Sequence, residues 1–236
     1  MLTIKPMFLA ALATVWLLDG VAQGQSSSFS QTNSVNAAVS GGYVPVSSSM
    51  TVSGLSGVTS EVQVTLNITN GYNGTLYAYL TDPNGQISIL LNDAGTGTNS
   101  ALGYTAFGYN DAGFNIVLSD GANNVHDYQL GGAYNLNGAN QLTGTWAPDG
   151  RNISPQSDPG AFDTASTAAD LSVFDYLNPN GIWTLTVADV GSGGGSGTST
   201  FVSWGLTVVT VPEPQTLALM AGGVGMLLAL KRRRKS

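Results

Sequence analysis

The sequence of 236 residues predicts an all-β fold, an antiparallel jelly-roll β-sandwich flanked by an N-terminal signal helix and a C-terminal transmembrane helix. Short stretches with an apolar residue at every second position recur through the middle of the chain, as strands with one buried face require. Turn-forming Gly, Asn, Asp and Pro residues separate these stretches. No amphipathic helical period occurs between the two apolar ends of the chain.

The alternation assigns the strands individually. In residues 61–68, Val62, Val64, Leu66 and Ile68 fall on one face, which is the pattern of a half-buried strand. The same reasoning predicts strands over 75–81, 86–91, 114–118, 183–187 and 201–211. Residues 149–169 lack such alternation, and we expect them to form a long loop.

The N-terminus is typical of a secretory signal peptide covering residues 1–24. Lys5 precedes an apolar stretch, 8–18, that is too short to span a bilayer. Ala22 and Gly24 fit the small-residue pattern cleaved by signal peptidase. Residues 25–52 are rich in Ser, Asn, Gln and Thr, and they form either a flexible leader or a first edge strand before the sandwich, which we assign to 53–210.

The C-terminal segment, 211–236, has three parts in order. Pro212, Glu213 and Pro214 precede an apolar stretch, 216–230, and a basic run follows, formed by Lys231, Arg232, Arg233, Arg234 and Lys235. A helix of that length reaches about 22 Å, which is short of a hydrocarbon core of about 30 Å. The basic run is expected to stay cytoplasmic, which places the sandwich outside the cell.

These three parts together resemble the PEP-CTERM sorting signal. The resemblance implies that Pro212, Glu213 and Pro214 are recognised by a membrane-embedded exosortase-type processing enzyme. It also implies a Gram-negative-type bacterium that makes exopolysaccharide, a membrane-anchored precursor, and a final place at the cell surface or in the extracellular matrix. A plain single-pass anchor is the alternative interpretation.

The body of the chain, from about 53 to 209, resembles the P domain (P/Homo B domain) of subtilisin-like proprotein convertases. The segments that carry the resemblance are 74–85, 87–91, 114–122 and a final hairpin, 180–189 with 201–207, which has Trp183 on one strand and Trp204 on the other. Both rings are expected in the core between the sheets. The family's subtilisin-like catalytic domain is not expected in this chain, and the middle, 92–178, is longer and richer in Asn and Gly than usual.

Charged residues are few and unevenly placed. Residues 25–210 contain twelve acidic residues and a single basic one, Arg151. Such a domain has no electrostatic attraction for nucleic acid, but it could attract divalent cations. Cysteine is absent, which excludes disulfides and thiolate chemistry.

Catalytic motifs are not recognisable, and we predict that the protein is not an enzyme. The single histidine, His126, lies in the polar stretch 121–127, where we expect a solvated surface side chain rather than a general base. No Gly-x-Ser-x-Gly sequence is present. Most aspartates lie beside Gly, Ala, Pro or Asn, as turn residues do, although paired-carboxylate chemistry is formally open.

Calcium is the cofactor that the acidic loops could accommodate. Five aspartates in predicted loops are candidate ligands, and solvated turn residues are the alternative interpretation: Asp93, Asp111, Asp120, Asp127 and Asp189. No EF-hand spacing occurs, so separate loops would have to supply the ligands. Tyr77 and Tyr79, with Trp146, could form an aromatic platform for sugars or serve cross-strand packing.

The sequence therefore predicts a non-catalytic exported surface or matrix protein, sorted through its C-terminal signal, whose sandwich serves adhesion or structural support. One alternative is a module that binds exopolysaccharide. Another is a secreted hydrolase or a protease-associated domain. The expected partners are an exosortase-type enzyme and signal peptidase, with exopolysaccharide as a third candidate, and no nucleic acid.

Overall fold

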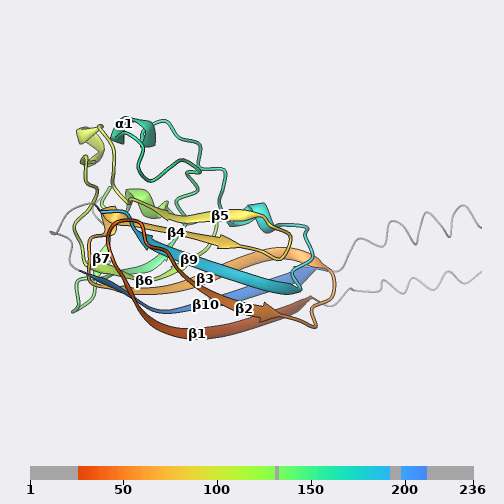
Figure 1. Cartoon of the computed structure of the whole chain (residues 1–236). Helices are drawn as coiled ribbons and strands as arrows, with labels where there is room; N and C mark the ends of the chain where they lie inside the picture. Colours follow the sequence, from red (N-terminus) through yellow and green to blue (C-terminus); the bar gives the residue numbers. More distant parts are fainter. Residues whose placement is uncertain (1–25, 131–132, 192–197, 212–236) are drawn as a thin grey trace, which may run out of the picture.

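Two β-sheets pack face to face in the computed structural model, which describes residues 26–130, 133–191 and 198–211 (Figure 1). One sheet has six strands in the order β1-β10-β3-β6-β8-β7, and the other has four in the order β2-β9-β4-β5. The strands are β1 (Ser27–Val39), β2 (Val46–Val52), β3 (Val58–Thr69), β4 (Leu76–Thr81), β5 (Ile87–Asn92), β6 (Gly113–Leu118), β7 (Asn135–Leu136), β8 (Leu142–Trp146), β9 (Gly181–Asp189) and β10 (Ser199–Val211). The all-β sandwich is confirmed, and the jelly-roll connectivity stays a prediction.

The helices of the described residues are short connectors. One is an α-helix, α1 (Pro159–Phe162), and the others are single 3₁₀ turns: η1 (Asn73–Thr75), η2 (Ser100–Leu102), η3 (Val125–Asp127) and η4 (Leu171–Phe174). None of the helices in this part of the chain is long and apolar enough to cross a membrane. The predicted signal helix and the predicted transmembrane stretch lie outside the described residues.

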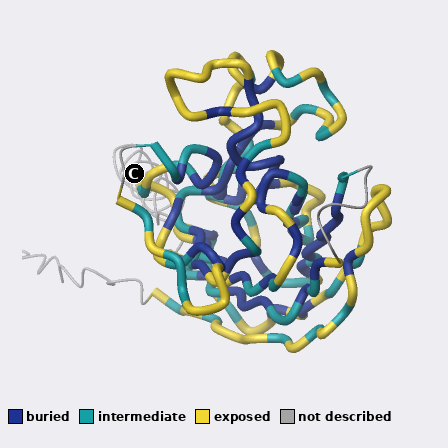
Figure 2. The backbone as a smooth tube through the Cα atoms, turned by 90° about the vertical axis from the view of Figure 1, so that its left-hand side faces the viewer, coloured by how far each residue is buried: buried dark blue, intermediate teal, exposed yellow. Residues whose placement is uncertain are grey.

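All of the strands assigned from alternation are present, as β3, β4, β5, β6, β9 and β10. In β3 the four side chains predicted to share a face, Val62, Val64, Leu66 and Ile68, are all buried. The rings of Trp183 and Trp204 are also buried between the sheets, and each indole N–H donates a hydrogen bond, to the Pro179 carbonyl and the Ser48 hydroxyl. Buried segments occupy the middle of the molecule and exposed segments its rim (Figure 2).

One pair of strands departs from the predicted antiparallel arrangement. β6 and β8 are parallel, with Phe114 opposite Leu142 and Leu118 opposite Trp146. The chain between them, 119–141, contains η3 and β7 and is long enough for the crossover that a parallel pair needs. Every other pair of described strands is antiparallel.

Residues 27–52 are not a leader outside the sandwich. Their strands β1 and β2 lie at the edges of the two sheets, where β1 pairs with β10 and β2 with β9. Of the two alternatives for this segment, the edge strand is therefore correct, and the sandwich begins before residue 53. Most side chains of β1 and β2 are exposed or half-buried, which explains why a Ser- and Asn-rich sequence suffices there.

The long loop predicted over 149–169 is confirmed and contains only α1. It lies along β5, with the N–H groups of Asp149 and Gly150 donating to the Leu90 and Ile89 carbonyls, and the Ile89 N–H donating to the Ala169 carbonyl. This loop and the loop after β5 gather at one end of the sandwich, with α1 at the tip (Figure 1). The free edge of β5 is thus covered.

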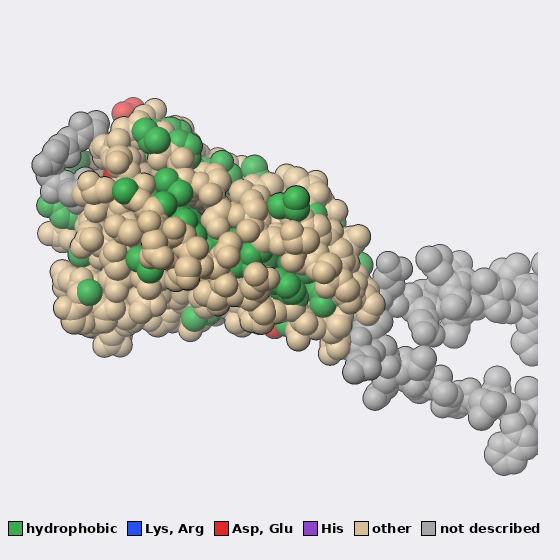
Figure 3. Space-filling model, turned by 60° about the horizontal axis from the view of Figure 1, so that its bottom comes forward, with side chains coloured by type: hydrophobic (Ala, Val, Ile, Leu, Met, Phe, Trp, Pro, Cys, Tyr) green, Lys and Arg blue, Asp and Glu red, His purple; other side chains and the backbone are tan. Residues whose placement is uncertain are grey.

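The surface carries few charges. On the face shown in Figure 3, polar side chains and backbone predominate, hydrophobic side chains are scattered, acidic ones are rare and no Lys or Arg is visible. Arg151, the one basic residue between 25 and 210, is only 7 % exposed. The described domain therefore presents an outer surface that is neutral or acidic.

Candidate functional site

His126 is fully buried, which corrects the prediction of a solvated loop histidine. It lies in η3, whose N-cap residue Asn124 accepts a hydrogen bond from the His126 backbone N–H at 2.8 Å. The imidazole stacks on Phe162, with the ring centroids 5.9 Å apart, and meets the edge of Tyr104. A sequence that reads as a polar loop is therefore folded into the interior, because a capped 3₁₀ turn and two aromatic rings surround its histidine.

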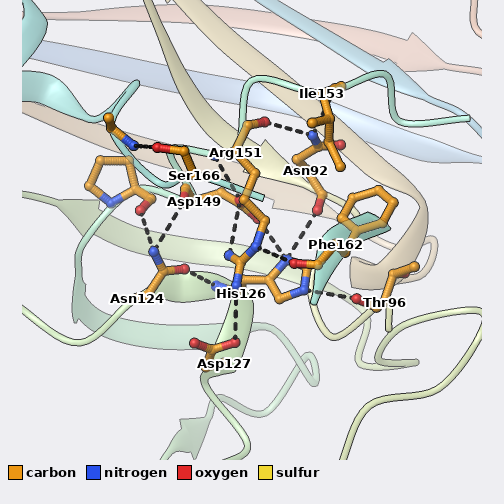
Figure 4. Close-up of polar contacts among 12 residues, drawn as sticks. Asn92, Thr96, Asn124, His126, Asp127, Asp149, Arg151, Ile153, Phe162 and Ser166 are labelled. Atoms are coloured by element: carbon orange, nitrogen blue, oxygen red, sulfur yellow. Dashed lines mark hydrogen bonds and ion pairs between the residues drawn. The ribbon is translucent and has the colours of Figure 1, made fainter. Parts of the chain in front are cut away.

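Both nitrogens of the His126 ring are occupied (Figure 4). Nδ1 lies 2.7 Å from Oδ2 of Asp149 and 3.2 Å from the Asn92 carbonyl oxygen, and Nε2 lies 3.0 Å from the Thr96 carbonyl oxygen. A general base needs a nitrogen that can reach a substrate proton, and neither nitrogen is free or exposed. No hydroxyl group hydrogen-bonds to His126 among the described residues, so no Ser-His-Asp triad is formed there.

Asp149 and Arg151 complete this network (Figure 4). Oδ1 of Asp149 accepts hydrogen bonds from the Arg151 backbone N–H and from Nη1, both at 3.2 Å, and Nε of Arg151 donates to the Phe162 carbonyl at 3.1 Å. Nη2 of Arg151 is also 3.8 Å from Asp127. The buried Asp149 carboxylate is thus paired on one oxygen with His126 and on the other with Arg151, as a buried charge requires.

A second buried network surrounds Asp111, one of the calcium candidates. Its Oδ2 accepts hydrogen bonds from the Tyr128 hydroxyl at 2.6 Å and from the Gln129 amide at 2.9 Å. Asn73 donates to the same hydroxyl and accepts from the Gly113 N–H. Burial and the bond to Asp111 raise the pKa of Tyr128, so its phenol stays a donor. The Asp111 carboxylate is therefore engaged in structural hydrogen bonds with Tyr128 and Gln129.

The five predicted calcium ligands do not come together. Among the described residues, no group of three or more His, Asp or Glu side chains is arranged to hold a metal. Asp127 accepts a short hydrogen bond from the Tyr104 hydroxyl and lies near Arg151, and Asp120 accepts one from the Leu171 N–H at 3.2 Å. Within the part of the chain that the structure describes, only Asp93 and Asp189 have buried carboxylate oxygens that lack any hydrogen-bond partner.

A partly exposed strip of tyrosines lies on the outer face of the four-stranded sheet. Tyr77 and Tyr79 project from β4 with their ring centroids 5.7 Å apart, and Tyr43, from the loop between β1 and β2, lies 6.2 Å from Tyr77. Tyr43 is 42 % exposed. Sequence reasoning found Tyr77 and Tyr79 but missed Tyr43, which only the strand order brings beside them. Trp146 is buried and packs against Tyr128, away from this strip.

The surroundings of this tyrosine strip are uncharged. The four strands of its sheet contain one charged residue, Asp189, and that side chain is fully buried. Beside the strip, the hydroxyls of Ser47 and Thr186 share a hydrogen bond of 2.9 Å. Burial and the neighbouring Tyr43 and Tyr79 raise the pKa of Tyr77 to about 12, so the Tyr77 phenol stays neutral. The face offers flat aromatic surface with hydroxyl donors and acceptors.

The predicted sorting motif Pro212, Glu213 and Pro214, the basic run and the cleavage residues Ala22 and Gly24 lie outside the described residues.

Asp120, in the loop after β6, supplies a test of loop electrostatics. Burial, and next the charge of Asp170, raise the pKa of Asp120 to about 6. Folding therefore favours the neutral acid, and stability is lost as the pH rises from about 4 through 6. Since Asp120 is half-exposed, we expect Asp120→Asn to raise the unfolding free energy at pH 7 by only about 1 kcal/mol and to change nothing at pH 4, as measured by urea unfolding.

Asp163→Asn is the matched control for this experiment. Hydrogen bonds from Thr98 lower the pKa of Asp163, so removing its charge should not stabilise the protein at pH 7. An equal gain for Asp120→Asn at both pH values would contradict the electrostatic explanation.

Comparison with known proteins agrees with the two resemblances. The proprotein convertase P-domain model matches residues 59–147, and the PEP-CTERM protein-sorting motif matches residues 210–235. A search of curated proteins found no match.

Among solved structures, a serine protease of Aeromonas sobria is similar at 16 % identity and a TM-score of 0.43, over 79 % of this chain and 27 % of the protease. Its complex with the chaperone ORF2 gives 15 % identity and a TM-score of 0.42, over 80 % of this chain and 28 % of that chain. The chain thus spans less than a third of that protease. It carries the PEP-CTERM sorting motif of exported, exosortase-processed proteins that begin as membrane-anchored precursors, on a β-sandwich similar to the P domain of proprotein convertases.

Proposed function

We propose that this protein is a non-catalytic component of the cell surface or extracellular matrix, and that its sandwich serves adhesion or structural support. The observation that carries the proposal is the state of His126. The single histidine of the chain has both ring nitrogens engaged by buried acceptors, so the residue best suited to acid–base chemistry is committed to the fold.

The outer surface supports the same proposal. Paired hydroxyls cross the strands at the surface, such as Ser30 with Thr207 at 3.0 Å and Ser49 with Thr184 at 2.9 Å. These rows are neutral and polar, and they keep long edge strands soluble without charge. A surface of this kind suits contact with hydrated polymers through many weak hydrogen bonds rather than steering of a charged substrate.

Sorting through the C-terminal motif is tested by processing. Replacing Pro212, Glu213 and Pro214 together with alanine should leave the precursor uncleaved in the membrane, because the recognition element is removed. The measurement is mass spectrometry of the C-terminal peptides of the membrane and surface forms. The control is alanine at Gln215 and Thr216, which lie just beyond the motif and should leave processing intact. A surface form that keeps Ser236 in the unaltered protein would contradict the proposal.

Binding of exopolysaccharide is a second candidate function, and the tyrosine strip is the observation that favours it. Three phenol rings follow one another across the outer face of a sheet that exposes no charged side chain. Aromatic rings stack on the apolar faces of sugar rings, while neighbouring hydroxyls supply hydrogen bonds. The strip therefore fits a neutral glycan chain better than an acidic or basic one.

Tyr77 lies in the centre of the strip, between Tyr43 and Tyr79, and should contribute most to such binding. We expect Tyr77→Ala to weaken binding of neutral polysaccharide by about tenfold or more, as measured by affinity electrophoresis or pull-down with purified polysaccharides.

Tyr72→Ala is the control, because Tyr72 is also a surface tyrosine, 39 % exposed, but makes no ring contact with the strip. If both variants bind as well as the unaltered protein, the strip is not a glycan site. Failure of this candidate leaves the processing experiment, and with it the surface-protein proposal, unaffected.

A further inference from the structure

Two buried carboxylates in the sandwich have oxygens with no partner. Asp93 follows β5 and Asp189 ends β9, and their side chains are 4 % and 0 % exposed. Oδ1 of Asp93 and Oδ2 of Asp189 are buried without a hydrogen bond, and so is Oδ1 of the adjacent Asn92. Leaving such acceptors unsatisfied costs free energy, and leaving charges buried and unpaired costs far more. The buried hydroxyls of Ser88 and Tyr109 lack partners too, but among the described residues Asp93 and Asp189 are the two carboxyl groups in this state.

The two aspartates lie at the same end of the four-stranded sheet, on either side of one residue of β4. Leu76 is the register partner of Asp189 on β9, and its carbonyl accepts a hydrogen bond of 3.1 Å from the Asp93 N–H. Asp93 and Asp189 are thus separated by a single intervening strand, which corresponds to about 10 Å between their backbones. The charge of Asp189 is one of the causes that raise the pKa of Asp93, so the two side chains are electrostatically coupled across that strand.

The electrostatic environment of Asp93 and Asp189 differs from that of Asp149. The Asp149 carboxylate is compensated by His126 and Arg151, whereas no ion pair among the described residues involves Asp93 or Asp189. Arg151 is the single basic residue between 25 and 210, so no other Lys or Arg of the domain can supply the charge. Burial, and then the charges of Asp149 and Asp189, raise the pKa of Asp93 to about 8. Two carboxylates thus repel each other in the interior without a counter-ion.

The other carboxylate oxygen of Asp189, Oδ1, is hydrogen-bonded and holds the side chain in place. It accepts a hydrogen bond of 2.9 Å from the Gly191 N–H, and the Asp189 backbone carbonyl accepts one from the Tyr43 N–H. One oxygen is therefore fixed by the turn after β9, while the other is left unpartnered. Hard divalent cations such as calcium bind carboxylate oxygens of this kind and complete their coordination with carbonyl groups and water.

We propose that Asp93 and Asp189 bind a calcium ion at this end of the sandwich. The ion would neutralise the two carboxylates and join the ends of β5 and β9 on either side of β4. It would supply a cross-link of the kind that exported proteins without cysteine cannot obtain from disulfides. The sequence marks five aspartates as candidate ligands. We choose these two because each has a buried carboxylate oxygen without a hydrogen-bond partner.

The test is calcium binding by the full chain purified in detergent and freed of metal. Titration with calcium chloride should release or absorb heat with a stoichiometry of one and should raise the Tm by about 5 °C or more at saturation. Magnesium chloride at the same concentration should have a smaller effect, since magnesium demands stricter octahedral geometry. Asp93→Asn and Asp189→Asn should each weaken calcium binding at least 100-fold.

The free energy of unfolding, measured in the presence of a chelator, shows whether a variant loses calcium binding because its site is gone or because its fold is damaged. Without metal, Asp93→Asn and Asp189→Asn should be at least as stable as the unaltered protein, because each removes a buried repulsive charge. Asp120→Asn, which also removes a partly buried loop carboxylate, is the matched control and should keep full calcium binding. The proposal is overturned if calcium changes neither heat nor Tm at pH 9, where Asp93 is ionised even without the ion, or if both variants bind calcium normally.

Discussion

The interaction on which the loops of this domain depend is the buried contact of His126 with Asp149. It joins segments that are distant in the sequence: the end of β5 through the Asn92 carbonyl, the next loop through Thr96, the turn η3, and the start of the long loop at Asp149. Arg151 extends the same network to α1 through the Phe162 carbonyl. A loop with few apolar residues cannot be held by burial alone, so a satisfied polar network replaces a hydrophobic core at this end.

The distribution of charge follows from this network. Because the domain places its one basic residue, Arg151, in the interior, its surface has only acidic and neutral side chains to present. The hydroxyl rows and the tyrosine strip then determine the surface chemistry, which suits hydrated neutral polymers. The same shortage of cations leaves Asp93 and Asp189 without protein partners, so an external cation is the natural means of compensating them.

The strands could be predicted from the sequence where one face is buried and the other is not. In β3 and β4 the alternation of apolar and polar residues records that asymmetry directly. β1 could be predicted only as one of two alternatives, because an edge strand needs little apolar surface. β8, with the sequence Leu-Thr-Gly-Thr-Trp, is too short and too rich in glycine to be recognised, and its parallel pairing depends on a crossover that local patterns do not encode.

The candidate sites were harder to predict from the sequence than the strands, because they are formed by residues that are distant in the chain. His126 lies in a stretch of Gly, Ala and Asn whose composition is that of a loop, and its burial results from partners at positions 92, 96, 149 and 162. Nothing local distinguishes Asp93 from Asp120 either, because what matters is the absence of a donor in the folded chain. Sequence could name the residue types of these sites, whereas only the fold decides which of them are satisfied.

The central claim is that the histidine of this protein serves structure and not catalysis. Urea unfolding of His126→Ala tests it most directly, since removing the imidazole leaves Oδ2 of the buried Asp149 carboxylate without its partner. The expected result is a loss of about 3–5 kcal/mol in the free energy of unfolding, with cooperative unfolding retained. A variant within about 0.5 kcal/mol of the unaltered protein would contradict the claim, because surface substitutions of no structural consequence fall in that range.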